Sequence, residues 1–433
     1  MKRRDFTKGG LALAGASLMA GALPSGRARA QEKVTLSFLH KWPEPDNIQF
    51  FQNAVSAFQA AHPNVTINMD AVADEPYKAK IRVVMASGEI PDIYFTWVGE
   101  YTRQFIRAGR LRDLTDYLGK PEWQGRFAPS TLEAYRTEGK LYGVPLNLDA
   151  KFMIYNKALF AKAGASAPTD WPSFTAALDK LKAAGITPIA FGSQLAWATS
   201  HYVGDLNAKL VPREVRLADY QLTFPVDKLF TDSGYTDALT YYRDFLIKGW
   251  FNKTPNAFTH AVARSSFFAG RNAMMYQELV EFGRVPGTKL EEDGWDFFPM
   301  PPIPGARGQQ DVLTGAPDGF VVSATSKHPD EAMAFLNFLT SQQQGAEFTR
   351  ITHRTSATIG SVTAANAPPQ TLRGIEEIGK AKELVLWLDT DIESRIASVY
   401  LAGAQALMGD SETPAQVMEK VRAAARQAKT ERG

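Results

Sequence analysis

Two alternating patterns of apolar and polar residues organise the first part of the chain. Residues 34–39 alternate apolar and polar side chains, which predicts a strand, and residues 51–58 repeat apolar side chains at helical spacing. The same succession follows at 65–69 and 77–87, and a third strand is predicted at 91–95. Strands that alternate with helices predict a doubly wound α/β domain, in which ligands bind beyond the carboxyl ends of the strands.

The later part of the chain carries a second set of these signals. Thr169 or Asp170 is expected to cap a helix, and residues 187–191 form a short apolar strand. A loop is expected at 192–201, and Pro329 opens another helix. With 433 residues, the chain exceeds the size at which a single core keeps growing, so two domains are predicted.

Leu141 to Asn156 lies between the two sets. Asn147, Asp149 and Lys151 stand at alternate positions, and the residues between them are apolar. Alternate residues of a strand share one face. We interpret this stretch as a strand that leaves one domain, crosses a cleft with its polar face toward the cleft, and enters the other. An ordinary edge strand with a solvated polar face fits these residues equally well.

The first thirty residues resemble an export signal. Arg3-Arg4-Asp5-Phe6 is a twin-arginine pattern, an apolar run covers residues 9–23, and Ala28-Arg29-Ala30 is a small-x-small cleavage site. The apolar run is too short to span a bilayer. We therefore predict a cleaved twin-arginine signal peptide at residues 1–30 and a mature chain that begins at Gln31.

Removing this segment changes the charge of the protein. The full chain carries a formal charge of +2, and residues 1–30 hold six basic residues and one acid, so the mature chain carries about −3. No basic footprint for nucleic acid is left. The chain has no cysteine, which excludes disulfides and a lipid anchor on cysteine. A monomeric periplasmic protein is expected.

Catalytic and metal-binding signatures are missing from the sequence. It contains no HExxH, G-x-S-x-G, Walker or dinucleotide motif, and its six histidines have no paired spacing. We therefore predict no catalytic residues, no metal and no cofactor.

Five separated segments resemble one family when they are taken in order. They are Ala86–Trp97, Leu141–Gly164, Pro168–Phe174, Phe267–Tyr276 and Thr314–Ser341. Their order is similar to that in the carbohydrate-binding extracellular solute-binding proteins of ABC importers, the maltose-binding-protein-like family. The resemblance implies a periplasmic-binding-protein fold: two doubly wound α/β lobes, joined by two or three crossover hinges, with a sugar between them.

The resemblance also implies a division of the chain. The N-terminal lobe is expected at 31–145 and 277–313, and the C-terminal lobe at 146–276 and 314–433. One segment departs from the family: residues 277–283 read QELVEFG where a glycine-rich segment with a tryptophan is usual. The missing aromatic residue argues against a long maltodextrin ligand.

A sugar site needs aromatic planes for C–H faces and polar side chains for hydroxyls. The family's acidic sugar contact falls on Asp149, and its pattern of contacts in the C-terminal lobe adds Arg354 and Trp387. Several tryptophans could instead be core residues, Asp318 could form a turn, and Glu278 with Glu281 could be a solvated pair. The candidate ligand-binding residues are His40, Trp42, Glu44, Trp97, Asn147, Asp149, Trp197, Gln277, Glu278, Asp318, Arg354 and Trp387.

These features predict a periplasmic protein that captures a mono- or oligosaccharide by hinge closure and delivers it to the permease subunits of an ABC importer. One alternative is a binding protein for a non-sugar solute, such as a polyol, a glycerophosphodiester or a polyamine. Another is an exported carbohydrate-degrading enzyme, which would need two carboxylates across a cleft, and Asp149 with Glu278 is the pair available.

Overall fold

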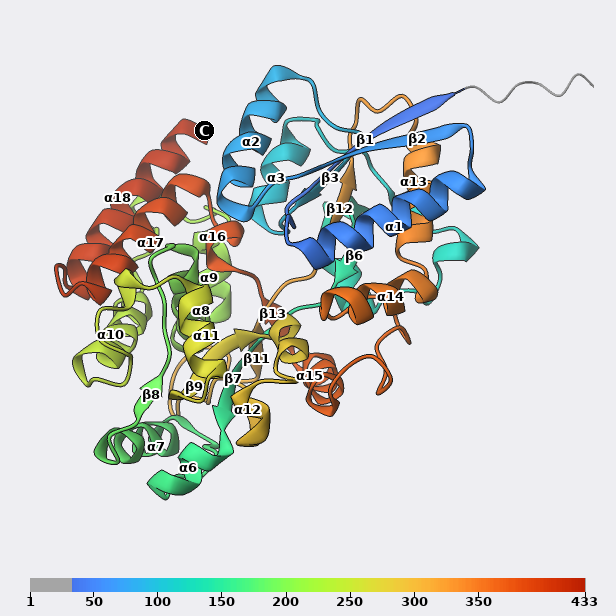
Figure 1. Cartoon of the computed structure of the whole chain (residues 1–433). Helices are drawn as coiled ribbons and strands as arrows, with labels where there is room; N and C mark the ends of the chain where they lie inside the picture. The colour runs from blue at the N-terminus through green and yellow to red at the C-terminus, as the bar shows by residue number, and fades with distance from the viewer. Residues whose placement is uncertain (1–32, 433) are drawn as a thin grey trace, which may run out of the picture.

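A computed structural model describes residues 33–432, which form two α/β lobes side by side (Figure 1). The predicted fold class is confirmed: each lobe is built on its own mixed sheet with helices packed against it. The predicted signal peptide lies outside the described residues. Within residues 33–432, no helix combines the length and the apolar character that a bilayer crossing requires.

The first lobe contains a five-stranded sheet. β1 pairs in parallel with β2 and β3, and β12 pairs antiparallel with β3 and β6. The ring of Phe38 in β1 meets Phe51, Phe320 and Phe335 at centroid distances of 5.6, 4.9 and 5.5 Å. This aromatic cluster holds sheet and helices together. In sheet order the strands are β2 (Val65–Ala71), β1 (Val34–His40), β3 (Ile93–Thr96), β12 (Asp318–Val322) and β6 (Val144–Asn147).

The helices of the first lobe come from two distant parts of the chain. The predicted helices at 51–58 and 77–87 are present and extend further toward the N-terminus. The regular elements outside the main sheet are α1 (Pro45–Ala61), α2 (Asp74–Ser87), α3 (Glu100–Arg107), α4 (Thr115–Leu118), η1 (Pro121–Trp123), α5 (Pro129–Glu133), β4 (Arg136–Thr137), β5 (Lys140–Leu141), α13 (Pro329–Leu339) and α14 (Gln342–Thr352).

The second lobe contains a four-stranded sheet that is buried on both faces. Phe152 and Ile154 of its strand β7 enter one hydrophobic cluster, and Met153 enters another. This alternation follows from the pleat of the strand, because successive side chains point to opposite faces. In sheet order the strands are β10 (Trp295–Phe298), β7 (Lys151–Asn156), β9 (Asn272–Glu278) and β8 (Thr187–Ile189).

Most of the remaining helices belong to the second lobe. Asp170 caps α7 as predicted: the Ser173 N–H donates to its carboxylate at 2.9 Å. The expected loop at 192–201 is wrong from Trp197 on, because α8 begins there. The helices are α6 (Lys157–Ala163), α7 (Trp171–Ala183), α8 (Trp197–Leu210), α9 (Arg213–Tyr220), η2 (Val226–Lys228), α10 (Ser233–Ile247), η3 (Pro255–Ala257), α11 (His260–Phe268), η4 (Leu279–Arg284), α12 (Lys289–Glu292), α15 (Pro369–Lys380), α16 (Leu388–Asp391), α17 (Ser394–Met408) and α18 (Pro414–Arg432).

The described chain passes between the lobes three times. It crosses from β6 to β7, then through β11 (Val312–Thr314) into β12, and finally between α14 and α15. β11 pairs in parallel with β13 (Glu383–Val385), which follows α15, so the second connecting segment is supported by a strand from the last part of the chain. The stretch that begins at Leu141 is therefore a crossover, built from strands of two different sheets and not from one continuous strand.

The expected division of the chain needs correction in two places. Residues 295–298 form β10, which pairs antiparallel with β7 and so belongs to the second lobe. Residues 318–352 belong to the first lobe, because β12 lies between β3 and β6 and the buried residues of α13 and α14 enter the first core. The physical reason is that a strand's pattern fixes its faces but not its partner, which is set by packing across long sequence distances.

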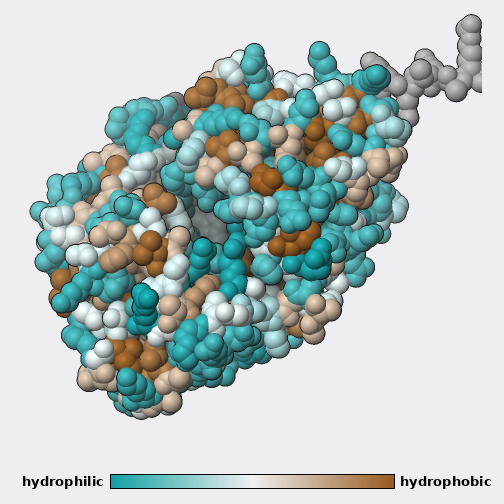
Figure 2. Space-filling model, in the orientation of Figure 1, coloured by the Kyte–Doolittle hydropathy of each residue, from teal (hydrophilic) through white to brown (hydrophobic). Residues whose placement is uncertain are grey.

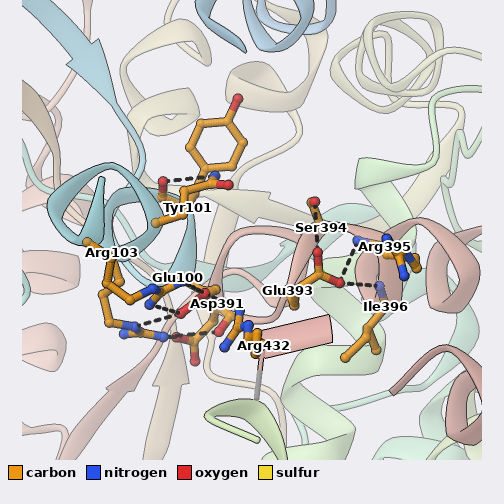
Figure 3. Close-up of polar contacts among 11 residues, drawn as sticks. Glu100, Tyr101, Arg103, Asp391, Glu393, Ser394, Arg395, Ile396 and Arg432 are labelled. Atoms are coloured by element: carbon orange, nitrogen blue, oxygen red, sulfur yellow. Dashed lines mark hydrogen bonds and ion pairs between the residues drawn. The ribbon is translucent and has the colours of Figure 1, made fainter. Parts of the chain in front are cut away.

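Ion pairs join the two lobes beside α3 and α16. Glu100, 5% exposed, pairs with Arg103 at 3.2 Å and also with Arg107 and Arg432, the last residue of α18. Arg103 also lies 3.3 Å from the carboxylate of Asp391. Figure 3 shows Glu100, Arg103, Asp391 and Arg432 gathered at one point. The C-terminal helix of the second lobe is thus tied to the first lobe.

Candidate functional site

The crossover between β6 and β7 brings polar side chains to the junction of the lobes. Asn147 is the register partner of Asp318 in β12 and is fully buried. Neither its amide oxygen nor its amide nitrogen has a hydrogen-bond partner among the described residues. Asp149 and Lys151 are 7% and 1% exposed, so the alternative of a solvated edge strand is wrong.

Asp149 is a buried carboxylate with few hydrogen bonds or charges to offset the loss of its hydration. The Val280 N–H donates to it at 3.4 Å, and no cation lies within 4 Å of it in the described part of the chain. Burial, together with the nearby carboxylates of Glu278 and Asp318, raises the pKa of Asp149 well above its ordinary range. The group is therefore poised to gain from any hydrogen-bond donor that approaches it.

Asp318 lies on the first-lobe side of the junction and is paired with Lys41. Their charged atoms are 3.0 Å apart, and Asp74 lies 3.6 Å from the same ammonium. Burial opposes the charge on Lys41, but Asp318 and Asp74 outweigh this effect and raise its pKa. Asp318 begins strand β12, so the alternative that it only forms a turn is wrong.

Trp97 follows β3 and is covered by cations. The ammonium groups of Lys41 and Lys78 lie 5.0 and 5.4 Å from its ring centroid, within the range of cation–π attraction. Lys78 in turn lies 3.2 Å from Asp389, in α16 of the other half of the junction. Trp97 therefore sits where both lobes meet, as its position at a strand end predicts.

The loop after β1 behaves differently from expectation. Trp42 is only 2% exposed and packs against Phe51, Phe95 and Phe320, so its ring belongs to the first core. The flanking proline and charges suggested a freely available ring, but the chain turns inward there.

The neighbours of Trp42 differ in exposure. His40 is fully buried, receives the Trp42 N–H on Nδ1 at 3.3 Å, and has no partner at Nε2 among residues 33–432. Burial lowers its pKa to about 4. Glu44 is exposed at the start of α1 and accepts a bond from Asn47 at 3.3 Å. Of the twelve candidates, Glu44 is the one whose side chain is exposed.

The second lobe contributes residues around the end of β9. Gln277 is fully buried and its oxygen lies 3.1 Å from His260 Nε2, while the Glu278 carboxylate lies 3.2 Å from Lys151. The alternative of a solvated Glu278–Glu281 pair is wrong, because Glu281 is buried and pairs with Arg264 at 2.7 Å.

Two tryptophan rings lie next to the ring of His201, which is itself a neighbour of Glu278. The ring centroids of Trp197 and Trp387 lie 5.3 and 4.6 Å from that of His201. Arg354 lies beside the crossover, since the next residue, Thr355, accepts the Leu148 N–H at 2.9 Å. Nε of Arg354 has no hydrogen-bond partner within the described chain.

Sequence reasoning did not select several residues that complete the junction. Lys41, Lys78 and Asp389 gave no signal, because single charges on loops and helices are usually solvated. His201 and His260 are separated in sequence and meet only through α8 and α11. Lys151 was marked by its alternation with Asn147 and Asp149, the only such signal among them. Among residues 33–432, no cluster of three potential metal ligands is present.

The architecture is that of a two-lobed solute receptor: three crossovers connect lobes that meet over buried, partly unpaired polar groups. In the view of Figure 2 the surface is hollowed between the lobes, and the rim of this hollow is mainly hydrophilic. The sequence profile of the bacterial extracellular solute-binding proteins matches residues 42–346, and the chain belongs to this family. The resemblance inferred from the five segments is thereby confirmed.

Individual relatives are distant but cover most of the chain. An uncharacterised ABC transporter extracellular-binding protein of Pyrococcus horikoshii is 26% identical over 73% of this chain and 71% of its own. A multiple sugar-binding protein of Streptococcus mutans is 23% identical over 79% of each. A solved chitin oligosaccharide binding protein superposes with a TM-score of 0.82 at 24% identity, covering 92% of this chain and 99% of its own. The last likeness concerns the fold.

Proposed function

We propose that this protein captures a mono- or oligosaccharide at the junction of its lobes and delivers it to an ABC importer. The observation that carries this proposal is the set of buried, unpaired polar atoms there: both side-chain atoms of Asn147 and Nε of Arg354. A buried polar group without a partner costs about 1–3 kcal/mol. Hydroxyl groups of a ligand can satisfy such atoms.

A sugar suits this mixture because each hydroxyl both donates and accepts. Asp149 and Glu278 can accept, Arg354 can donate, and Asn147 can do both. Trp197 and Trp387 offer aromatic surface for C–H faces. The names of several relatives, among them the multiple sugar-binding protein and the chitin oligosaccharide binding protein, support the same class of ligand.

Hinge closure is the mechanism that the burial supports. Asn147, Asp149 and Trp387 are 0%, 7% and 8% exposed with the lobes in contact, so a solute reaches them only when the lobes separate. The three crossovers are the hinges. A ligand that bridges both lobes shifts the population toward the closed form, which then docks on the permease subunits.

Export precedes this function. We assign residues 1–30 as a cleaved twin-arginine signal peptide and place the mature protein in the periplasm, without a lipid anchor because no cysteine is present. The family is described as extracellular, which supports export. We propose that the mature protein acts as a monomer without a cofactor.

A hydrolase is the competing function with a specific structural feature. Asp149 has a raised pKa, whereas the ammonium of Lys151 and the two nearby histidines outweigh burial and lower the pKa of Glu278. Two carboxyl groups pushed in opposite directions are what glycoside hydrolysis requires. The family, however, is one of binding proteins.

Calorimetry against a panel of solutes tests the proposal. We expect one neutral mono- or oligosaccharide to bind with micromolar affinity, about −8 kcal/mol, and to be recovered without change by chromatography. A polyol, a glycerophosphodiester or a polyamine that binds while every sugar fails would contradict the sugar assignment. Cleavage products would instead establish the hydrolase. Mass spectrometry of the ligand that co-purifies with the protein provides an independent identification.

A further inference from the structure

Three basic side chains from three different elements surround Glu278. Lys151 Nζ of β7 lies 3.2 Å from Oε1, and Nδ1 of His201 in α8 lies 3.6 Å from the same oxygen. On the other oxygen, Nε2 of His260 at the start of α11 lies 3.9 Å from Oε2. Lys151 also donates to the Tyr276 carbonyl at 3.2 Å, so its ammonium is itself fixed.

Aromatic rings border this cluster. The rings of His260, Trp197, His201 and Trp387 follow one another with centroid distances of 5.1, 5.3 and 4.6 Å. They come from α11, from α8 and from the residue before α16, so the wall is assembled from distant segments. A carboxylate beside an aromatic wall can accept hydroxyls while an aromatic ring contacts the C–H face of the same sugar.

The charges around Glu278 keep its carboxylate ionised. Burial opposes ionisation, but the ammonium of Lys151 together with the two histidines lowers the pKa of Glu278. Burial also lowers the pKa of both histidines, so at neutral pH they are uncharged and the ammonium supplies the attraction. Glu278 thus remains an acceptor. The two uncharged imidazoles lie 3.6 and 3.9 Å from its oxygens, beyond hydrogen-bond distance, so they confine the carboxylate by contact and leave its lone pairs for a ligand.

Glu278 is the last residue of β9, and Lys151 is its register partner in β7, so the strand pair fixes the backbone of both residues. The site therefore presents a polar contact on a rigid strand end. Such a contact reads the hydroxyl pattern of a ligand more strictly than a ring does, because a ring stacks on many sugars.

We propose that Glu278 selects the ligand by accepting two neighbouring hydroxyls of a neutral pyranose, and that Lys151, His201 and His260 are positioning residues that fix its carboxylate. The inference rests on the proposed sugar-binding function and adds to it a particular specificity determinant. Ligands that lack one of the two hydroxyls leave one lone pair of the Glu278 carboxylate without a hydrogen-bond donor while the ligand excludes water from it. The resulting loss is about 10- to 100-fold in affinity, the value of one charge-assisted hydrogen bond.

The experiment compares affinities within a series of sugars. D-glucose, D-galactose, D-xylose, N-acetyl-D-glucosamine and their β-linked disaccharides are screened by calorimetry, and singly deoxygenated forms of the tightest binder follow. We expect the full-length mature protein to reject one or two deoxy forms at least 10-fold. In Glu278→Gln this ratio should fall below about 3-fold.

The ratio of the affinities for the parent sugar and for its deoxy form distinguishes a positioning role from an effect on folding stability. Lys151→Met and His260→Phe should flatten the ratio as Glu278→Gln does, whereas Lys151→Arg should restore much of it. A folding defect lowers affinity for the parent sugar and the deoxy sugar alike and leaves the ratio unchanged. Lys209→Met is the matched control, because Lys209 is equally buried in the same lobe and faces Asp205 at 3.9 Å.

The outcomes distinguish the two proposals. If a sugar binds but Glu278→Gln keeps the full discrimination, the selection by Glu278 is overturned and the sugar-binding function stands. If Glu278→Gln loses discrimination while Lys151→Met and His260→Phe both retain it, the positioning roles are overturned. If no sugar binds to the unmodified protein, both proposals fall.

Discussion

Arg432, the last residue of α18, forms an ion pair with Glu100, the first residue of α3, so the C-terminus of one lobe is fastened to the other (Figure 3). The pair does not act alone, because Arg103 links the same Glu100 to Asp391. Burial of Glu100 opposes its charge, but the surrounding arginines lower its pKa, so the carboxylate stays ionised. These contacts stabilise the arrangement in which the lobes touch.

Breaking this contact should favour the open form. For Arg432→Met we expect a larger radius of gyration of the ligand-free protein in solution scattering. Ligand affinity should fall about 2- to 5-fold, since a partly exposed ion pair contributes up to about 1 kcal/mol. Raising the salt concentration should reduce the difference. Arg426→Met is the control, because Arg426 lies on the same helix and forms no ion pair within residues 33–432. Identical behaviour of the two variants would contradict the role of Arg432.

Asp149→Asn should weaken ligand binding without harming the fold. The carboxylate is buried with one weak hydrogen bond, so we expect the neutral amide to raise the melting temperature of the ligand-free protein. Loss of a charge-assisted bond to a hydroxyl should reduce affinity about 10- to 100-fold. Calorimetry measures the affinity, and thermal unfolding checks the fold.

A second carboxylate of the same lobe provides the contrast. Asp219 accepts bonds from the Phe230 N–H and the Tyr235 hydroxyl at 2.7 and 2.9 Å, away from the junction. Asp219→Asn should therefore lower the melting temperature and leave affinity unchanged. Unchanged affinity in Asp149→Asn itself would remove Asp149 from the site.

His40 should make the protein less stable in acid. Its pKa is lowered by burial from 6.5 to about 4 in the folded chain, so the unfolded chain binds the proton more readily between these values. The stabilisation is complete above pH 6.5 and is lost as the pH falls toward 4. Its size is about 3 kcal/mol. Urea unfolding at a series of pH values measures it.

His40→Asn isolates this contribution. The asparagine oxygen can still accept the Trp42 N–H that His40 Nδ1 accepts. The variant should lose less stability than the unmodified protein between pH 6.5 and 4, although His201 and His260, whose pKa values are also lowered by burial, continue to contribute. Parallel pH profiles for the two proteins would exclude His40 as a source of the acid sensitivity.

Gly99→Ala should disturb the contact between α3 and α16. The residue has φ 89°, and an added Cβ would lie 2.9 Å from the Thr390 carbonyl oxygen. We expect a loss of about 3 kcal/mol in unfolding free energy from the combined strain and clash. Gly109→Ala has φ 66° with open space around it and should cost about 1 kcal/mol. Equal losses of unfolding free energy in the two variants would show that the contact with Thr390 does not contribute.

The sequence was informative wherever a local pattern determines the structure. Alternation at 34–39 and helical spacing at 51–58 predicted β1 and α1 because each pattern fixes which face is buried. The alternating polar residues of the crossover fitted an edge strand equally well, and the order of the five family segments on either side favoured the crossover. The fold class followed from the order of these elements.

Partners across long sequence distances were not predictable in the same way. β12 and β10 have ordinary strand patterns, and nothing local tells which sheet each one joins. Trp42 was expected at the site because proline and charges flank it, but it fills a space left by Phe51, Phe95 and Phe320. His201 and His260 meet Glu278 only because α8 and α11 converge on β9, which requires the folded chain.

Because β12 lies between β3 and β6, the sheet of the first lobe cannot form completely until β12 has been synthesised. β3 and β6 emerge from the ribosome early, whereas the strand that separates them, Asp318–Val322, emerges late. Until then both neighbours expose an unpaired backbone edge, the kind of edge that recruits other chains. Any fragment that stops before residue 318 lacks a whole first lobe. Premature termination should therefore yield fragments that aggregate or are degraded by proteases, not a smaller functional binding protein.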